Sequence, residues 1–138
     1  MGRIIAIDYG KKRTGLAVSD PLKIIAGGLT TLPSYKIIPF LKEYVNKEDV
    51  ELFILGEPRN MNYEFSENMD RVLKFRDNLK QAIPQVEIKM VDERFTSVLA
   101  HQAMLQGGLK KKDRQNKELV DELSATILLQ SYLETIRI

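Results

Sequence analysis

The sequence predicts an α/β fold in which helices flank a mixed five-stranded sheet. Three consecutive strand-like segments begin the chain, and helical and strand-like segments then alternate. This order is typical of an antiparallel meander that continues into β-α-β units. A length of 138 residues corresponds to one compact domain, which we place at residues 1–138.

The three strands of the meander are expected at residues 3–8, 15–19 and 26–32. Residues 3–8 (RIIAID) are apolar at odd and even positions alike, which favours a central strand that is buried on both faces. Residues 9–14 contain a glycine and three basic side chains, so we expect a turn there. The short connections predict antiparallel pairing of these strands.

A helix is expected at residues 36–46, where apolar side chains recur with a helical period, and a short buried strand at 52–55. Ser66 is a suitable N-cap for a helix that ends near Pro84. In that helix we expect Phe75 to lie partly off the apolar face.

The last third of the chain is expected to form a strand at 86–91 and a helix that Thr96 caps and that ends at Gly107-Gly108. A basic loop over residues 107–117 and a final helix over 118–136 complete the order of elements.

The composition narrows the chemistry that is open to the chain. The 21 Lys and Arg against 19 Asp and Glu leave a net charge of +2, and the chain has no cysteine and one histidine, His101. These counts exclude a disulfide scaffold, a thiolate zinc site and a multi-histidine cluster, so a metal would be held mainly by oxygen ligands. Without a long apolar stretch or a signal-like start, we expect a cytoplasmic protein that does not associate with membranes.

Three acids occupy positions where a site can form. Asp8 ends the first strand, Glu93 follows the last strand, and Asp121 lies in the first turn of the final helix. If the first and fourth strands are parallel neighbours and the fifth lies beside the fourth, Asp8 and Glu93 open on one edge of the sheet. The small residues Ser124 and Ala125 share a helix face with Asp121 and would let it approach that edge. The alternative is that each acid is an ordinary surface or helix-terminus carboxylate.

Converging carboxylates require a cation, because like charges a few ångströms apart cannot all stay ionised unaided. Mg²⁺ or Mn²⁺ suits oxygen ligands. Two such ions about 3.5–4 Å apart can activate water and stabilise the leaving oxygen of a phosphodiester. We therefore expect a two-ion site at the three acids.

Basic residues lie beside each of these acids. Lys11, Lys12 and Arg13 follow Asp8, Arg94 follows Glu93, and residues 107–117 carry five basic side chains against one acid. Contacts of Lys and Arg with phosphates supply most of the sequence-independent affinity for nucleic acids. A single lysine run is more often solvated surface, but three runs beside three acids favour a nucleic-acid substrate.

Four blocks of the chain are similar to the motifs of one protein family: IIAIDYGKKRTGLAVSD (4–20), GEPRNMN (56–62), VDERFTS (91–97) and VDELSATILLQSYL (120–133). The resemblance is to the YqgF family. Its members are bacterial ribonuclease H-like proteins, described as Holliday-junction resolvases and as nucleases that mature the 5′ end of 16S ribosomal RNA. The resemblance covers essentially the whole chain, with the blocks in the same order.

The resemblance implies a ribonuclease H-like fold and a divalent-metal site built from the catalytic acids Asp8, Glu93 and Asp121. Arg13 and Arg94 would contact substrate phosphates. The whole set that we expect to bind substrate is Gly10, Lys11, Lys12, Arg13, Arg59, Arg94, Thr96, Lys110, Lys111, Lys112 and Arg114. The chain departs from the family pattern at Asn62-Tyr63, where Asp-Gly is usual, which leaves the role of loop 59–65 open. It also departs at Ser124, where alanine is usual.

We therefore expect a divalent-metal nuclease that acts in 5′-end maturation of a 16S rRNA precursor. A Holliday-junction resolvase and a non-catalytic nucleic-acid-binding module of ribosome assembly stay open as alternatives. A phosphotransferase of the actin and sugar-kinase type also begins with a strand-borne Asp-x-Gly, but such enzymes close two domains over a nucleotide. The expected partners are structured RNA or branched DNA and a pre-ribosomal particle, with the protein a monomer or a homodimer.

Overall fold

The computed structural model describes residues 2–57, 69–92 and 117–136. In chain order the elements are β1 (Arg3–Asp8), β2 (Arg13–Ser19), β3 (Ala26–Pro33), the 3₁₀ turn η1 (Ser34–Lys36), α1 (Ile37–Lys47), β4 (Val50–Glu57), α2 (Met69–Ala82), β5 (Glu87–Asp92) and α5 (Lys117–Ile136). Among the described helices, none combines the length and the apolar character that a membrane span requires.

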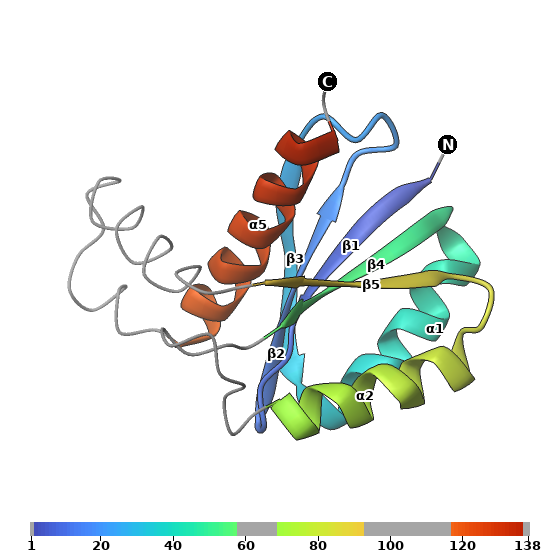
Figure 1. Ribbon diagram of the computed structural model, residues 1–138, viewed down its shortest axis with the longest axis vertical. Helices are drawn as coiled ribbons and strands as arrows, with labels where there is room; N and C mark the ends of the chain where they lie inside the picture. Colours follow the sequence, from blue (N-terminus) through green and yellow to red (C-terminus); the bar gives the residue numbers. More distant parts are fainter. Residues whose placement is uncertain (1, 58–68, 93–116, 137–138) are drawn as a thin grey trace.

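The five strands form one mixed sheet in the order β3-β2-β1-β4-β5 (Figure 1). β1 pairs antiparallel with β2, and β2 pairs antiparallel with β3, so the first three strands form the expected meander. β1 pairs parallel with β4, and β4 pairs parallel with β5. The carboxyl ends of β1, β4 and β5 therefore lie at the same edge of the sheet, which is the arrangement assumed for the predicted site.

Helices cover both faces of the sheet, because the central strand is apolar on both sides. Ile5 and Ile7 of β1 belong to a core cluster with α1 and α2, whereas Ile4 and Ala6 belong to a second cluster with α5. Figure 1 shows α1 and α2 on one side of the sheet and α5 on the other. β1 is thus buried on both faces and lies at the centre of the fold. Each Å² of apolar surface removed from water stabilises the folded state by roughly 25 cal/mol.

Small residues let α5 lie close to the sheet. The helix packs across β1, β2 and β3, and Ser124 and Ala125 face the sheet with 2% and 0% of their surface exposed. A Cβ placed on Gly15 of β2 would clash with the main chain of Asp121, and one placed on Gly28 of β3 would clash with the side chain of Glu122. The close approach that Ser124 and Ala125 suggested is therefore present, with two glycines of the sheet completing it.

Most element boundaries lie within one residue of expectation, and three differences bear on the site or have a clear cause. β2 begins at Arg13, two residues early, because Arg13 and Thr14 pair with the end of β3. β4 covers Val50–Glu57 and is longer than 52–55, because Val50 pairs with β1 and Gly56 and Glu57 pair with β5. α5 begins at Lys117, so Asp121 lies in its second turn and not in its first.

The expectation for Phe75 was wrong. Its side chain is 5% exposed and packs in the cluster between the sheet and helices α1 and α2, because the ring of Tyr9 stacks on it. The expected N-cap Ser66 and the expected helix after Thr96 lie outside the described residues.

Candidate active site

Asp8 stands at the carboxyl end of the central strand and on the face that α5 covers. It is the last residue of β1, and side chains alternate between the two faces of a strand. Ile4 and Ala6 pack in the cluster with α5, so the alternation places Asp8 on that face as well. The residue is half-buried and takes part in a polar interaction within the fold.

Gly15 brings Asp121 close to Asp8. Gly15 is the pairing partner of Asp8 on the neighbouring strand β2. Its missing side chain leaves room for the main chain of Asp121 and Glu122, which any Cβ at position 15 would meet. Asp121 therefore lies over the strand next to Asp8, on the same face of the sheet. Two of the three predicted acids thus come together from opposite ends of the chain.

Arg13 forms an ion pair with Asp121 in this region. The Nε of Arg13 lies 2.5 Å from Oδ2 of Asp121, and the two side chains are 34% and 25% exposed. A partly buried pair of opposite charges is screened less by solvent than a surface pair. The guanidinium thus offsets part of the negative charge that Asp8 and Asp121 gather at this edge.

The turn after Asp8 is held by two hydroxyl groups that the sequence analysis did not connect. The hydroxyl of Ser34 donates to the carbonyl oxygen of Gly10 at 2.5 Å, and the hydroxyls of Ser34 and Thr14 are 2.8 Å apart. The amide of Gly10 donates to Oγ1 of Thr14 at 3.5 Å. The amide of Ser34 donates to the carbonyl oxygen of Lys12 at 3.0 Å. For Thr14 the available signal was a polar residue within the apolar pattern of β2, whereas Ser34 lies in η1 and not in a strand.

The described candidates lie around this corner of the sheet. Lys11 and Lys12 are exposed on the turn between β1 and β2, directly after Asp8 and Gly10. Across the sheet, β5 ends at Asp92, so the third predicted acid, Glu93, lies outside the described residues. Outside them too are the candidates Arg59, Arg94, Thr96, Lys110, Lys111, Lys112 and Arg114.

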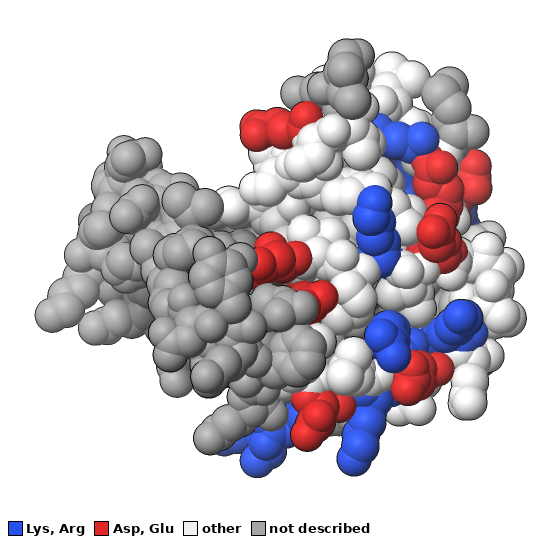
Figure 2. Space-filling model, viewed as in Figure 1, with Lys and Arg blue, Asp and Glu red and all other residues white. Residues whose placement is uncertain are grey.

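The described part of the chain contains two of the three acids that the sequence predicts as metal ligands, and it shows no cluster of three or more His, Asp or Glu residues that could hold a metal ion. On the described part of the face in Figure 2, basic and acidic side chains alternate without a broad patch of one sign.

The comparison with known protein families decides the identity. Residues 2–135 match the family model RuvX, described as Holliday junction resolvase.

The chain belongs to the RuvX family.

Similar proteins support this assignment along the whole chain. A protein of Phocaeicola vulgatus is 63% identical over 135 residues, which cover 98% of this chain and 97% of that protein. A Bacteroides fragilis protein is 60% identical over 138 residues and matches along the whole length of both chains. Both carry the name "Putative pre-16S rRNA nuclease". The family resemblance and the nuclease function predicted from the sequence are confirmed.

Solved structures support the fold of this RuvX-family chain. RuvC of T. thermophilus, in complex with a Holliday junction substrate, superposes with a TM-score of 0.59 at 16% identity and covers 99% of this chain and 97% of that one. A second structure of Thermus thermophilus RuvC gives a TM-score of 0.57 at 17% identity, with 96% and 97% covered. RuvC has a ribonuclease H-like fold, so the predicted fold class is confirmed.

Proposed function

We propose that this RuvX-family nuclease hydrolyses phosphodiester bonds at a divalent-metal site of Asp8, Glu93 and Asp121, and that its substrate is the 5′ region of a 16S rRNA precursor. One observation supports the site above all others. Gly15 pairs with Asp8 and leaves room for the main chain of Asp121. The main chain at Asp121 thus lies against the residue that pairs with Asp8, which supports a site that uses both acids.

The described residues suit a hard divalent cation. Asp8 and Asp121 offer carboxylate oxygens, which Mg²⁺ and Mn²⁺ prefer, and both are only half-buried and so open to solvent exchange. Glu93 follows β5, whose carboxyl end lies at the same edge as that of β1. When bound there, such an ion would supply charge for a phosphate oxygen and lower the pKa of a water molecule.

The chain's own residues would position the substrate. Asp8 and Asp121 are carried by a central strand and by a helix packed on it, so little reorganisation is needed when they act. Arg13 lies against Asp121 with a third of its side chain exposed, which leaves guanidinium N–H groups for a phosphate oxygen. Lys11 and Lys12, exposed on the same turn, would attract the phosphate backbone of the nucleic-acid substrate.

The choice of substrate rests on similar proteins. Relatives at 60–63% identity over nearly the whole chain are named for pre-16S rRNA. The family description names the Holliday junction, and one structure that shares the fold was determined with such a junction. Sequence identity of 60% is far stronger support for a shared substrate than a fold shared at 16%. We therefore place ribosomal RNA first and branched DNA second.

A cleavage panel tests this proposal. Purified protein with Mg²⁺ would be incubated at fixed salt with a precursor 16S rRNA fragment, a four-way DNA junction, an RNA duplex and a single-stranded RNA. We expect cleavage of the precursor near its mature 5′ end, and none in the presence of EDTA.

The Asp8→Asn variant should lose cleavage by a factor of about 10³ or more and still bind RNA. The Asp49→Asn variant, an exposed acid between α1 and β4, is the matched control and should cleave normally. Activity that persists in Asp8→Asn would overturn the site. Binding without cleavage by the wild-type protein would indicate a non-catalytic assembly module, and cleavage of the junction alone would indicate a resolvase.

A further inference from the structure

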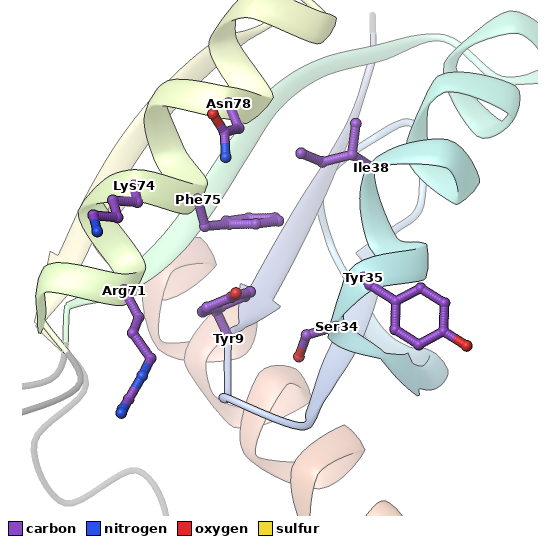
Figure 3. Close-up of a pocket in the computed structure, with 8 residues that line it drawn as sticks. All are labelled: Tyr9, Ser34, Tyr35, Ile38, Arg71, Lys74, Phe75 and Asn78. Carbon is purple, nitrogen blue, oxygen red and sulfur yellow. The ribbon is translucent and has the colours of Figure 1, made fainter.

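A pocket of about 350 Å³ lies beside Tyr9, between α2 and the segment that runs from η1 into α1 (Figure 3). Tyr9, Ser34, Tyr35, Arg71, Lys74 and Phe75 are among the residues that line it. Its volume is within the range of about 300–1,000 Å³ that small-molecule sites occupy. The candidate active site does not use this pocket.

The pocket lies on the opposite face of the sheet from Asp8 but at the same edge. Tyr9 follows Asp8 directly, and it packs in the cluster formed with α1 and α2, whereas the alternation of β1 turns Asp8 toward α5. Consecutive Cα atoms are about 3.8 Å apart. A nucleic-acid strand bound at Asp8 would therefore have to cross only the edge of the β-sheet to reach the pocket.

Aromatic surface forms one wall. The rings of Tyr9 and Phe75 stack with their centroids 4.4 Å apart and their planes at 21°. Phe75 is buried at 5% exposure and holds the ring of Tyr9 in place from α2. Tyr35 also lines the pocket, but it is 77% exposed and its ring points away from Tyr9 and Phe75 (Figure 3), so Tyr9 supplies the aromatic surface next to the cavity. Rigid aromatic rings of this kind are the surfaces on which unpaired bases stack.

Positive charge and hydrogen-bonding groups form the mouth. Arg71 and Lys74 are three residues apart on α2, so they share one side of that helix, and both are exposed. The pocket lining includes the amide of Asn78 but neither of the neighbouring acids of α2, Asp70 and Asp77. A ligand that carries a negative charge next to a planar ring matches these groups.

We propose that this pocket binds one nucleotide of a single-stranded segment beside the cleavage site, with the base against the aromatic wall and a phosphate at Arg71 and Lys74. This proposal rests on the proposed function, because the nucleotide in the pocket would belong to the same substrate strand that passes Asp8. The pocket recognises an unpaired nucleotide and not a duplex, since paired bases do not expose their faces.

Binding is measured in the Asp8→Asn background, so that cleavage does not interfere. Fluorescein-labelled eight-nucleotide RNA and DNA single strands and an RNA duplex of the same sequence would be titrated at fixed salt by fluorescence anisotropy. Tyr9→Leu and Lys74→Gln should each raise the Kd for the single strands by about five-fold or more. Tyr9→Phe keeps the ring and Lys80→Gln changes a lysine of α2 outside the pocket, and both should leave the Kd unchanged.

A second arm uses wild-type protein and NMR spectroscopy, with uridine 5′-monophosphate as the probe. We expect shifts of the side-chain amide of Asn78 and of the ring signals of Tyr9, and no shifts in the Lys74→Gln variant. Equal binding of RNA and DNA strands would indicate recognition of base and phosphate alone, and a preference for RNA would add a contact to the 2′-hydroxyl. Either result supports the pocket.

An unchanged Kd in Tyr9→Leu and Lys74→Gln, or an equal loss for the duplex and for the single strands, would overturn the proposal. The two proposals fail separately. If the wild-type protein cleaves no substrate but these variants still lose single-strand binding, the proposed function is wrong and the pocket assignment stands. If cleavage is present and the variants bind normally, the pocket assignment is wrong.

Discussion

The Nε of Arg13 lies 2.5 Å from Oδ2 of Asp121, although 108 positions separate the two residues along the chain. The pair links the first residue of β2 to α5 at the point where Gly15 lets the helix touch the sheet. The carboxylate expected to hold a metal therefore already has a cationic partner. A guanidinium and a divalent cation would compete for the charge of Asp121.

The Arg13→Gln variant should bind Mn²⁺ more tightly than the wild-type protein, by about 1.5-fold to 5-fold. This range corresponds to roughly 0.2–1 kcal/mol, the usual contribution of a partly exposed ion pair. Isothermal titration calorimetry measures the affinity. Arg76→Gln, which removes the exposed partner of Asp77, is the control and should have no effect. Weaker Mn²⁺ binding in Arg13→Gln would mean that Arg13 supports the site and does not compete in it.

The Gly15→Ala variant should lower the free energy of unfolding by about 1–3 kcal/mol, because its Cβ would force α5 away from the sheet. It should also weaken Mn²⁺ binding, because Asp121 moves with the helix. Gly27→Ala on β3 is the control: a Cβ there has its nearest contact at 4.0 Å, the carbonyl oxygen of Val18. Urea unfolding measures the free energy of unfolding of both variants. Equal values for Gly15→Ala and Gly27→Ala would contradict the close approach of α5 to the sheet at Gly15.

Removing the hydroxyl of Ser34 should destabilise the turn after Asp8. The Ser34→Ala variant leaves the carbonyl of Gly10 and the buried hydroxyl of Thr14 without this partner, at a cost of about 1–3 kcal/mol. Thr14→Val should cost a similar amount. The double variant should cost less than the sum, because both side chains belong to one network. Thr135→Ala, an exposed hydroxyl near the end of α5, is the control in urea unfolding; strict additivity would argue against the network.

The loop between β2 and β3 should loosen in acid. The amide of Ile25 donates to the carboxylate of Asp20, as do those of Ile24 and Leu22, and these bonds hold the pKa of Asp20 below its ordinary value of 3.8 against a smaller effect of desolvation. Because the pKa is lowered by folding, the stabilisation is complete above the unfolded value and is lost as the pH falls through the folded value.

Amide signals of Ile24 and Ile25 followed by NMR spectroscopy should therefore titrate with a midpoint below pH 3.8. At neutral pH, Asp20→Ala should speed hydrogen exchange at both amides several-fold, because their acceptor is lost. Asp49→Asn should leave both rates unchanged. A midpoint above 3.8 would show that the carboxylate does not accept these bonds in solution.

The order of elements could be predicted because each rests on local pattern. The apolar run of β1 indicated burial on both faces, and the small residues Ser124 and Ala125 indicated a close helix. The start of β2 was missed, because three basic residues in a row suggested a turn although Arg13 pairs with the end of β3. The burial of Phe75 was missed for a related reason: its partner, Tyr9, comes from a distant strand end.

The sequence by itself determined the class of fold, because strand and helix periods are properties of the residues alone. The acids and the kind of ion that they suit stay predictions from the same residues and from the absence of cysteine. The tertiary structure decided which side chains meet. It joined Arg13 to Asp121, and it set the ring of Tyr9 on Phe75 to form one wall of a pocket. Such contacts depend on strand register and helix approach, and these are settled by the packing of the whole core and not by neighbours in the chain.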